Sequence, residues 1–196
     1  SGLVDFDGRD IGKWKSKELA KRLAILTQSN NIQMKLTVRE LVTFGRFPYS
    51  GSHLNEEDQR IIDKAIAYME LEPFQDRFID ELSGGQLQRV CIARAVACKP
   101  EVILFDEAIS SLDAHTQVQV MDLLRDLKEK LGLTYVFITH DLTSITYLCD
   151  DVLFLYQGRV TEYLPVSRIS APKAEYARRL LESIVVFDTE TSEVDV

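Results

Sequence analysis

The most informative stretch of the sequence is Leu82-Ser83-Gly84-Gly85-Gln86, from which the predictions of fold and function start. It stands directly ahead of a run that reads as a helix, and Ser83 and Gln86 have the S-x-x-Q spacing of a capping box, so we expect Ser83 to be the N-cap. The two glycines lower helix propensity, but they let backbone N–H groups approach a bulky anion such as a phosphate. The helix dipole would add about half a positive charge there. An ordinary glycine-rich helix start is the alternative that this stretch alone leaves open.

Three further motifs follow in order. They are the apolar run 102–105 with Asp106 and Glu107 at its end, the stretch Ser111-Leu112-Asp113, and the apolar run 135–138 followed by Thr139-His140-Asp141. Together with residues 82–86, this series resembles the nucleotide-binding subunit of ABC transporters, with its LSGGQ signature, Walker B strand and adjoining glutamate, D-loop and switch histidine. The resemblance covers nearly the whole chain, and four motifs in the correct order and spacing argue against a chance match.

The composition is that of an ordinary globular domain. The chain has 196 residues, 45% hydrophobic and 28% charged, which is enough to bury one core. Its net charge of −8 argues against a nucleic acid as partner, because such surfaces depend on clustered Lys and Arg. Three cysteines without a C-x-x-C pair fit a reducing compartment, and Cys91 and Cys98 are expected on one buried helical face. No apolar run approaches the roughly 20 residues that cross a bilayer, and no signal-peptide pattern is present, so a cytosolic location is expected.

The order of the elements predicts an α/β fold. Residues 102–105 and 135–138 are continuous apolar runs, typical of strands buried on both faces of a parallel sheet, and residues 114–130 supply the crossover helix. Ligands of such sheets gather at the carboxyl ends of the strands, where Asp106, Glu107 and His140 are expected. The resemblance implies a P-loop NTPase-like, mostly parallel sheet flanked by helices, with an inserted all-helical subdomain.

We expect four parts within one partial ABC ATPase domain. These are core residues 1–35 with the Q-loop, helical residues 36–84 ending in the signature, core residues 85–170 with Walker B, D-loop and switch histidine, and residues 171–196 with a C-terminal helix and an acidic tail. Smaller elements are strands at 1–7 and 22–26, a helix at 17–21, capping boxes at Thr37 and Asn55, a hairpin at 151–163, a helix at 173–183 and an aperiodic tail at 185–196.

An aromatic stretch, Arg46-Phe47-Pro48-Tyr49, lies within the helical part. We interpret it as a loop that either contacts a partner or packs into the core, and both alternatives stay open. The resemblance implies that the helical subdomain receives the coupling helices of transmembrane permease subunits.

The chemistry that the resemblance implies is hydrolysis of ATP with Mg²⁺. Phosphoryl transfer needs a metal on the phosphates, a group that orients or deprotonates the water, and donors for the γ-phosphoryl oxygens. Asp106 suits the Mg²⁺ shell, mostly through water, and Glu107 would be the general base. His140 would donate to the γ-phosphate and hold Glu107 and the water in line. Gln28 matches the Q-loop glutamine, which reaches the Mg²⁺ shell and the water. Taken alone, these residues would be solvated carboxylates, a loop glutamine and a structural histidine.

The resemblance also implies that the site is shared between two chains. Two subunits pack head to tail, and Ser83, Gly84, Gly85 and Gln86 of each cap the ATP bound to its partner. Asp113, besides its simpler interpretation as a helix N-cap, matches the D-loop aspartate that crosses this interface. The expected partners are therefore a second ABC ATPase subunit, permease subunits and, indirectly, a substrate-binding protein, with no nucleic acid.

The phosphate loop G-x-x-x-x-G-K-[ST] does not occur in these 196 residues. The family places it ahead of the first strand seen here, so we expect a chain truncated at its N-terminus. Without the Lys and Ser/Thr of that loop, ATP and Mg²⁺ lose their principal anchor, and these residues alone are expected neither to bind ATP tightly nor to hydrolyse it. An uncovered apolar sheet face and poor solubility are further expectations.

The leading function is the ATPase subunit of a bacterial importer, peripheral on the cytoplasmic face of the plasma membrane. Residues 1–86 look most like iron-siderophore importers and residues 87–184 like peptide and nickel importers, which a composite chain would explain. A non-catalytic fragment that supplies only the signature half-site, or has no function, is the alternative. A DNA-repair or chromosome-organising ATPase would carry long coiled coils, for which residues 36–81 are too short, and a translation-factor relative would have two cassettes.

Overall fold

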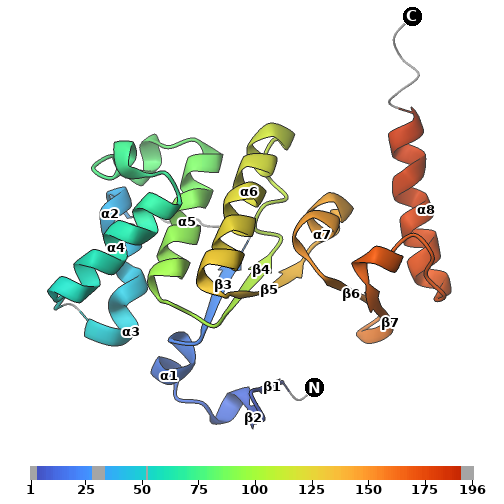
Figure 1. Ribbon diagram of the computed structural model, residues 1–196, viewed down its shortest axis with the longest axis horizontal. Coiled ribbons are helices and arrows are strands. Elements are labelled where there is room, and N and C mark those ends of the chain that lie inside the picture. The colour runs from blue at the N-terminus through green and yellow to red at the C-terminus, as the bar shows by residue number, and fades with distance from the viewer. Residues whose placement is uncertain (1–3, 28–33, 52, 191–196) are drawn as a thin grey trace, which may run out of the picture. The chain divides into compact units, whose positions relative to one another are not determined.

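The computed structural model describes residues 4–27, 34–51 and 53–190, with side chains as far as residue 183 (Figure 1). Contacts divide the chain into two compact units, Ser1–His140 and Asp141–Val196. The four parts expected from the sequence follow other boundaries and stay a prediction.

A parallel sheet forms the centre of the first unit. Its strands, in the order β3-β4-β5, are β3 (Leu23–Thr27), β4 (Val102–Asp106) and β5 (Thr134–Ile138). The register aligns Thr27 with Asp106 and Asp106 with Ile138, so the carboxyl ends of all three strands meet at one edge. The predicted α/β fold with a parallel sheet is confirmed.

One face of this sheet is covered by helices. Leu26, Ile103 and Phe105 are fully buried there. The hydroxyl of Tyr135 donates to the carbonyl oxygen of Leu124 at 3.0 Å, which ties β5 to helix α6. The covering helices are α5 (Gly84–Ala97) and α6 (Ala114–Leu131), and Figure 1 shows α6 in front of β3 and β4.

The opposite face is apolar and open within the part of the chain that the structure describes. Ile25, Val136 and Ile138 are 54%, 45% and 51% exposed. These residues alternate with the buried ones because successive side chains of a strand point to opposite faces. The prediction that the strand at 135–138 is buried on both faces is therefore wrong, and in the strand at 102–105 the side chains of this face, Val102 and Leu104, are half-buried. The expected uncovered apolar face is present.

Capping boxes open three helices of the first unit, as predicted. Thr37 caps α2 (Val38–Thr43), Asn55 caps α4 (Glu56–Tyr68) and Ser83 caps α5. In each case the side chain at the third helical position accepts from the backbone of the cap residue. Each box satisfies two backbone donors that a helix start leaves unpaired. Cys91 in the middle of α5 and Cys98 at its C-cap are buried, as expected.

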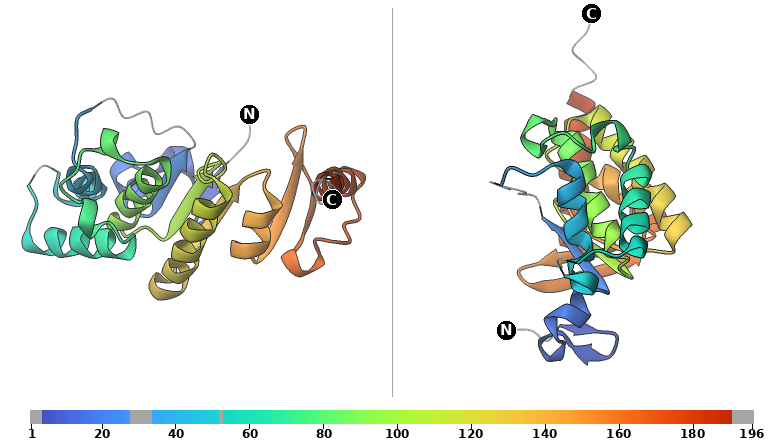
Figure 2. Two further views of the ribbon diagram at one scale, coloured as in Figure 1. Left: turned by 90° about the horizontal axis from the view of Figure 1, so that it is seen from above. Right: turned by 90° about the vertical axis from the view of Figure 1, so that its left-hand side faces the viewer.

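The residues between the cap at Thr37 and the signature form the all-helical insertion, gathered beside the sheet in the left panel of Figure 2. A backbone bridge between Thr37 and Phe78 closes its base. The elements are α2 (Val38–Thr43), η2 (Phe44–Arg46), α3 (Phe47–Ser50), α4 (Glu56–Tyr68), η3 (Glu72–Phe74) and η4 (Ile79–Glu81).

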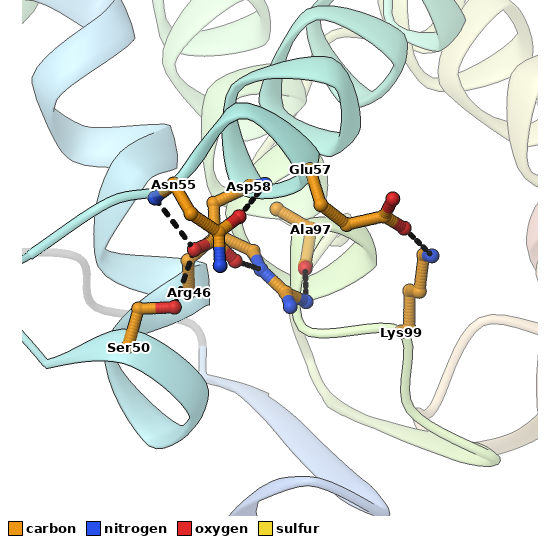
Figure 3. A network of polar contacts seen from close by, with 7 residues as sticks. All are labelled: Arg46, Ser50, Asn55, Glu57, Asp58, Ala97 and Lys99. Carbon is orange, nitrogen blue, oxygen red and sulfur yellow. Dashed lines mark hydrogen bonds and ion pairs between the residues drawn. The ribbon is translucent and has the colours of Figure 1, made fainter.

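The aromatic stretch of this insertion, residues 46–49, is helical, and Arg46 is its buried residue. Pro48 stands in the first turn of α3, where the missing N–H costs nothing, so the stretch is not the predicted loop. Arg46 is 4% exposed and donates to Asp58 at 2.8 Å and to the carbonyl oxygen of Ala97 at 2.9 Å (Figure 3). Phe47 is 60% exposed. The alternative that this stretch packs into the core is therefore wrong for Phe47. The alternative that Phe47 contacts a partner stays a prediction.

The N-terminal segment is a short hairpin, and within the described residues the predicted strand over residues 1–7 is present only at Asp5–Phe6. Asp7 and Gly8 both have positive φ and form its turn. Arg22 holds the hairpin near the sheet, because its guanidinium pairs with Glu101 at 2.6 Å and with Asp7 at 2.9 Å. The elements are β1 (Asp5–Phe6), β2 (Arg9–Asp10), η1 (Ile11–Lys13) and α1 (Ser16–Ala20).

The second unit is built on the predicted hairpin. Val152, Phe154 and Leu164 are buried against Ala177. The last helix runs to Glu190, because neither Gly nor Pro follows Ser183 to stop it, so the predicted aperiodic tail from residue 185 is wrong as far as residue 190. The helix Leu142–Leu148 was not predicted. The elements are α7 (Leu142–Leu148), β6 (Asp151–Tyr156), β7 (Arg159–Pro165), η5 (Val166–Arg168) and α8 (Glu175–Glu190).

Candidate functional site

The candidate site begins where β4 ends. Asp106 is the last residue of the strand and is exposed. The next residue, Glu107, has φ +50°, a left-handed conformation that few residues other than glycine adopt. Its backbone N–H donates to Ile138 at 2.9 Å, and its carbonyl oxygen accepts from the Ser110 hydroxyl at 2.8 Å. Backbone strain of this kind persists where the surroundings hold it, and it concentrates at functional sites.

His140 meets Glu107 at this edge. The Nδ1 atom of His140 lies 3.4 Å from Oε1 of Glu107. The His140 side chain is 73% exposed and that of Glu107 is 37% exposed, so both can reach a ligand in solvent. The structure thus brings together two of the predicted residues from the ends of neighbouring strands.

The acidic groups at this edge suit a hydrated cation. Among the described residues no group of three or more His, Cys, Asp or Glu is arranged to hold a metal ion by itself. Mg²⁺ is commonly held by one or two carboxylates together with waters and substrate phosphates, so the exposed carboxylate of Asp106 fits that ion. Gln28, the other residue expected near Mg²⁺, lies outside the described residues.

The signature stretch forms an exposed helix start. The Ser83 hydroxyl accepts from the Gln86 N–H at 3.3 Å, and the Gln86 side-chain oxygen accepts from the Ser83 N–H at 3.0 Å. Ser83 and Gly84 are exposed, and a Cβ added to Gly84 would meet no atom within 4 Å. The N-cap and the first turn of α5 are therefore accessible to a ligand or to another molecule.

Gly85 differs from Gly84. It is buried, and a Cβ added there would overlap the Thr116 side chain on α6. The sequence predicted that both glycines let a phosphate approach the backbone, and it did not predict the contact between Gly85 and Thr116. No sequence pattern indicates this contact, because it joins two helices that only the fold places side by side.

Asp113 is the N-cap of α6. Its Oδ1 atom accepts from the Thr116 N–H at 3.0 Å. This backbone hydrogen bond, followed by one from the Thr116 side chain, lowers the pKa of Asp113 because both favour the charged carboxylate. The predicted N-cap is confirmed. The expected contact of Asp113 across a subunit interface stays a prediction.

Comparison with known proteins identifies the sequence family. Residues 1–110, more than half of the chain, match the model of the ABC transporter family. The petrobactin import ATP-binding protein YclP of Bacillus subtilis is 44% identical over 165 residues, which cover 84% of this chain and 66% of that protein. A putative peptide import ATP-binding protein of Brucella abortus is 37% identical over 191 residues, 94% of this chain and 60% of that protein. The chain therefore spans about two thirds of the length of the curated relatives it matches.

Solved structures agree with this assignment. A dimeric ATP-binding cassette bound to ADP and Pi in a post-hydrolysis state superposes with a TM-score of 0.71 at 32% identity, covering 85% of this chain and 74% of that one. A putative metal-chelate type ABC transporter in an inward-facing conformation gives a TM-score of 0.70 at 28% identity. The match covers 76% of this chain and 59% of that one. No helix in the part of the chain that the structure describes has the length and apolar character to cross a membrane. With the matched model, the relatives and the fold in agreement, this chain belongs to the ABC transporter family.

Proposed function

We propose that the chain is the ATP-binding and ATP-hydrolysing part of an importer subunit for a metal chelate, such as an iron-siderophore, or for a peptide- or nickel-type solute. The observation that carries this proposal is the pairing of Glu107 with His140 beside Asp106, at the edge of the sheet where three strands end. The names of the relatives support import, since they are petrobactin and peptide import ATP-binding proteins.

Each residue at this edge has a separate task in the proposed reaction. Asp106 would hold Mg²⁺, mostly through water; the bound ion would neutralise charge on the β- and γ-phosphates. Glu107 would accept a proton from water as the water oxygen bonds to the γ-phosphorus and the bond from that phosphorus to the bridging oxygen of ADP breaks. Nδ1 of His140 faces Glu107, and its Nε2 would donate to the γ-phosphoryl oxygens in the form in which both ring nitrogens carry a proton. Gln28 is proposed to reach the same ion and water.

The signature is proposed to serve a second molecule. Ser83, Gly84, Gly85 and Gln86 would complete an ATP site on another ABC ATPase subunit, with Asp113 at the interface between the two. The exposure of Ser83 and Gly84 supports this assignment, because a helix N-terminus in solvent offers N–H groups and positive dipole to a phosphate. A second subunit is therefore part of the proposed site.

The remaining partners are proposed from the same family relationship. Transmembrane permease subunits would bind the chain at the cytoplasmic face of the plasma membrane, and a substrate-binding protein would act indirectly through them. The exposed Phe47 on α3 is available for such a contact.

The test uses a full-length chain in which a G-x-x-x-x-G-K-[ST] loop precedes residue 1. Glu107→Gln should lower kcat by about 10²-fold to 10⁴-fold, the usual contribution of a general base, while ATP binding is kept. The same variant should accumulate an ATP-bound dimer that size-exclusion chromatography detects. Hydrolysis at the unmodified rate by Glu107→Gln would show that Glu107 is not the base.

A further inference from the structure

Gly85 is a point of close contact between the signature helix α5 and α6. A Cβ built on Gly85 would overlap Cγ2 of Thr116 and lie 3.5 Å from its Cβ and 3.7 Å from its Oγ1. The methyl group of Thr116 thus occupies the space that any larger residue at position 85 would need. Packing at this contact is close, so an added methyl group must displace the Thr116 side chain or shift one of the two helices.

Thr116 also belongs to the cap of α6. Its N–H donates to Oδ1 of Asp113 at 3.0 Å, and its side chain also hydrogen bonds to Asp113. One side of Thr116 therefore contacts the first turn of α5, and the other side holds the N-cap of α6. Ser83 and Asp113 are the caps of these two helices, and both are exposed.

We propose that Thr116 is a positioning residue that fixes the start of α5 against the start of α6, so that Ser83 and Asp113 form one rigid edge. The inference rests on the proposed function, in which both caps face a second subunit. In this proposal Gly84 and Gly85 have different roles. Gly84 leaves room for the incoming partner. The backbone of Gly85 belongs to the same proposed ATP site, and its missing side chain leaves room for Thr116 of its own chain. Because a displacement of about 1 Å at a catalytic group can cost about 10²-fold in rate, a fixed spacing between the two caps has a direct effect on turnover.

The test exploits the size of the Thr116 side chain. Gly85→Ala should clash with Cγ2 of Thr116, and Thr116→Ser removes that methyl group but keeps the hydroxyl and the backbone cap. Thr116→Val is the matched control, because it keeps a methyl group and removes the hydroxyl. The variants are Gly85→Ala alone, and Gly85→Ala combined with Thr116→Ser or with Thr116→Val.

Two measurements separate packing from function. The first is the thermal unfolding midpoint of each chain. The second is the ATPase activity that each chain restores to a full-length relative whose own signature serine has been replaced by arginine. Gly85→Ala should lower the midpoint by about 5 °C and the restored activity by about 10²-fold. Adding Thr116→Ser should recover both quantities, and adding Thr116→Val should recover neither.

The contrary outcomes are distinct. If Thr116→Ser fails to recover the midpoint, or if Gly85→Ala does not lower it, the packing contact is wrong. If the midpoint recovers but the activity does not, the methyl group at position 85 disturbs the nucleotide itself and Thr116 is not a positioning residue. If the unmodified chain restores no activity, the proposed function in trans fails and the inference fails with it. Restoration that Gly85→Ala leaves undiminished overturns the inference alone.

Discussion

The Nδ1 atom of His140 lies 3.4 Å from Oε1 of Glu107, and this contact joins the end of β5 to the end of β4. Glu107 is held for it by a left-handed backbone, φ +50°, and by a hydrogen bond from its N–H to Ile138. The two side chains come from positions 33 residues apart in sequence, and adjacent parallel strands bring them together.

His140→Ala should lower kcat of the full-length chain by about 10²-fold or more, because it removes the group proposed to orient Glu107 and to donate to the γ-phosphate. The His140 side chain is 73% exposed and contributes little packing, so the thermal midpoint should not change. Steady-state kinetics and thermal unfolding of the same preparation separate the two effects. A variant that keeps kcat would remove His140 from the site.

Gly84→Ala should separate folding from function. A Cβ at this position meets nothing within 4 Å, and alanine favours helix over glycine by about 1 kcal/mol, so the thermal midpoint should stay or rise slightly. The ability to restore ATPase activity to a signature-dead relative should be lost, because the added methyl group lies where the partner's nucleotide is expected. Full restoration by Gly84→Ala would place the nucleotide elsewhere.

Asp113 should make the stability of the chain depend on pH in acid. Its folded-state pKa lies below the usual value, so the stabilisation by its carboxylate is fully present above about pH 3.9 and is lost as pH falls through the lower folded value. Asp113→Ala should therefore lower the unfolding midpoint near neutral pH, and the difference from the unmodified chain should shrink below about pH 4. Asparagine also caps helices, so Asp113→Asn should lower the unfolding midpoint at neutral pH much less than Asp113→Ala does. A difference that stays constant into acid would contradict the role of the charge.

The buried pair of Arg46 and Asp58 should control the stability of the helical insertion. The two are 4% and 1% exposed, so Arg46→Met leaves a buried carboxylate without its cation and should cost about 3–5 kcal/mol in unfolding free energy. The control is Phe47→Ser, which changes an exposed side chain next to Arg46 in the sequence. It should change the unfolding free energy by less than about 0.5 kcal/mol. Urea unfolding measures both. The double variant Arg46→Met with Asp58→Leu should lose less than the single one, and an equal or larger loss would contradict the pairing.

Much of the fold could be predicted because its signals are local. The capping boxes at Thr37, Asn55 and Ser83 and the strands at 102 and 135 each depend on a few neighbouring residues, and the structure has them all. The order of the motifs then placed Glu107 and His140 at one edge, because parallel strands align their carboxyl ends.

What the sequence did not predict depends on contacts between distant segments. The steric role of Gly85 requires Thr116 on another helix, and the burial of Arg46 requires Asp58 and the end of α5. The open face of β5 was missed for a related reason. An apolar strand has the same pattern whether its second face is covered or not, so Val136 and Ile138 read as buried although both are exposed.

The central claim is that Ser83 at the start of α5 completes a phosphate site on a second chain. The most direct measurement is the ATPase activity of a full-length relative with an inactivated signature, alone, mixed with this chain, and mixed with its Ser83→Arg variant. Activity should return with the unmodified chain and stay absent with Ser83→Arg. No return of activity, or equal return with both chains, would contradict the claim.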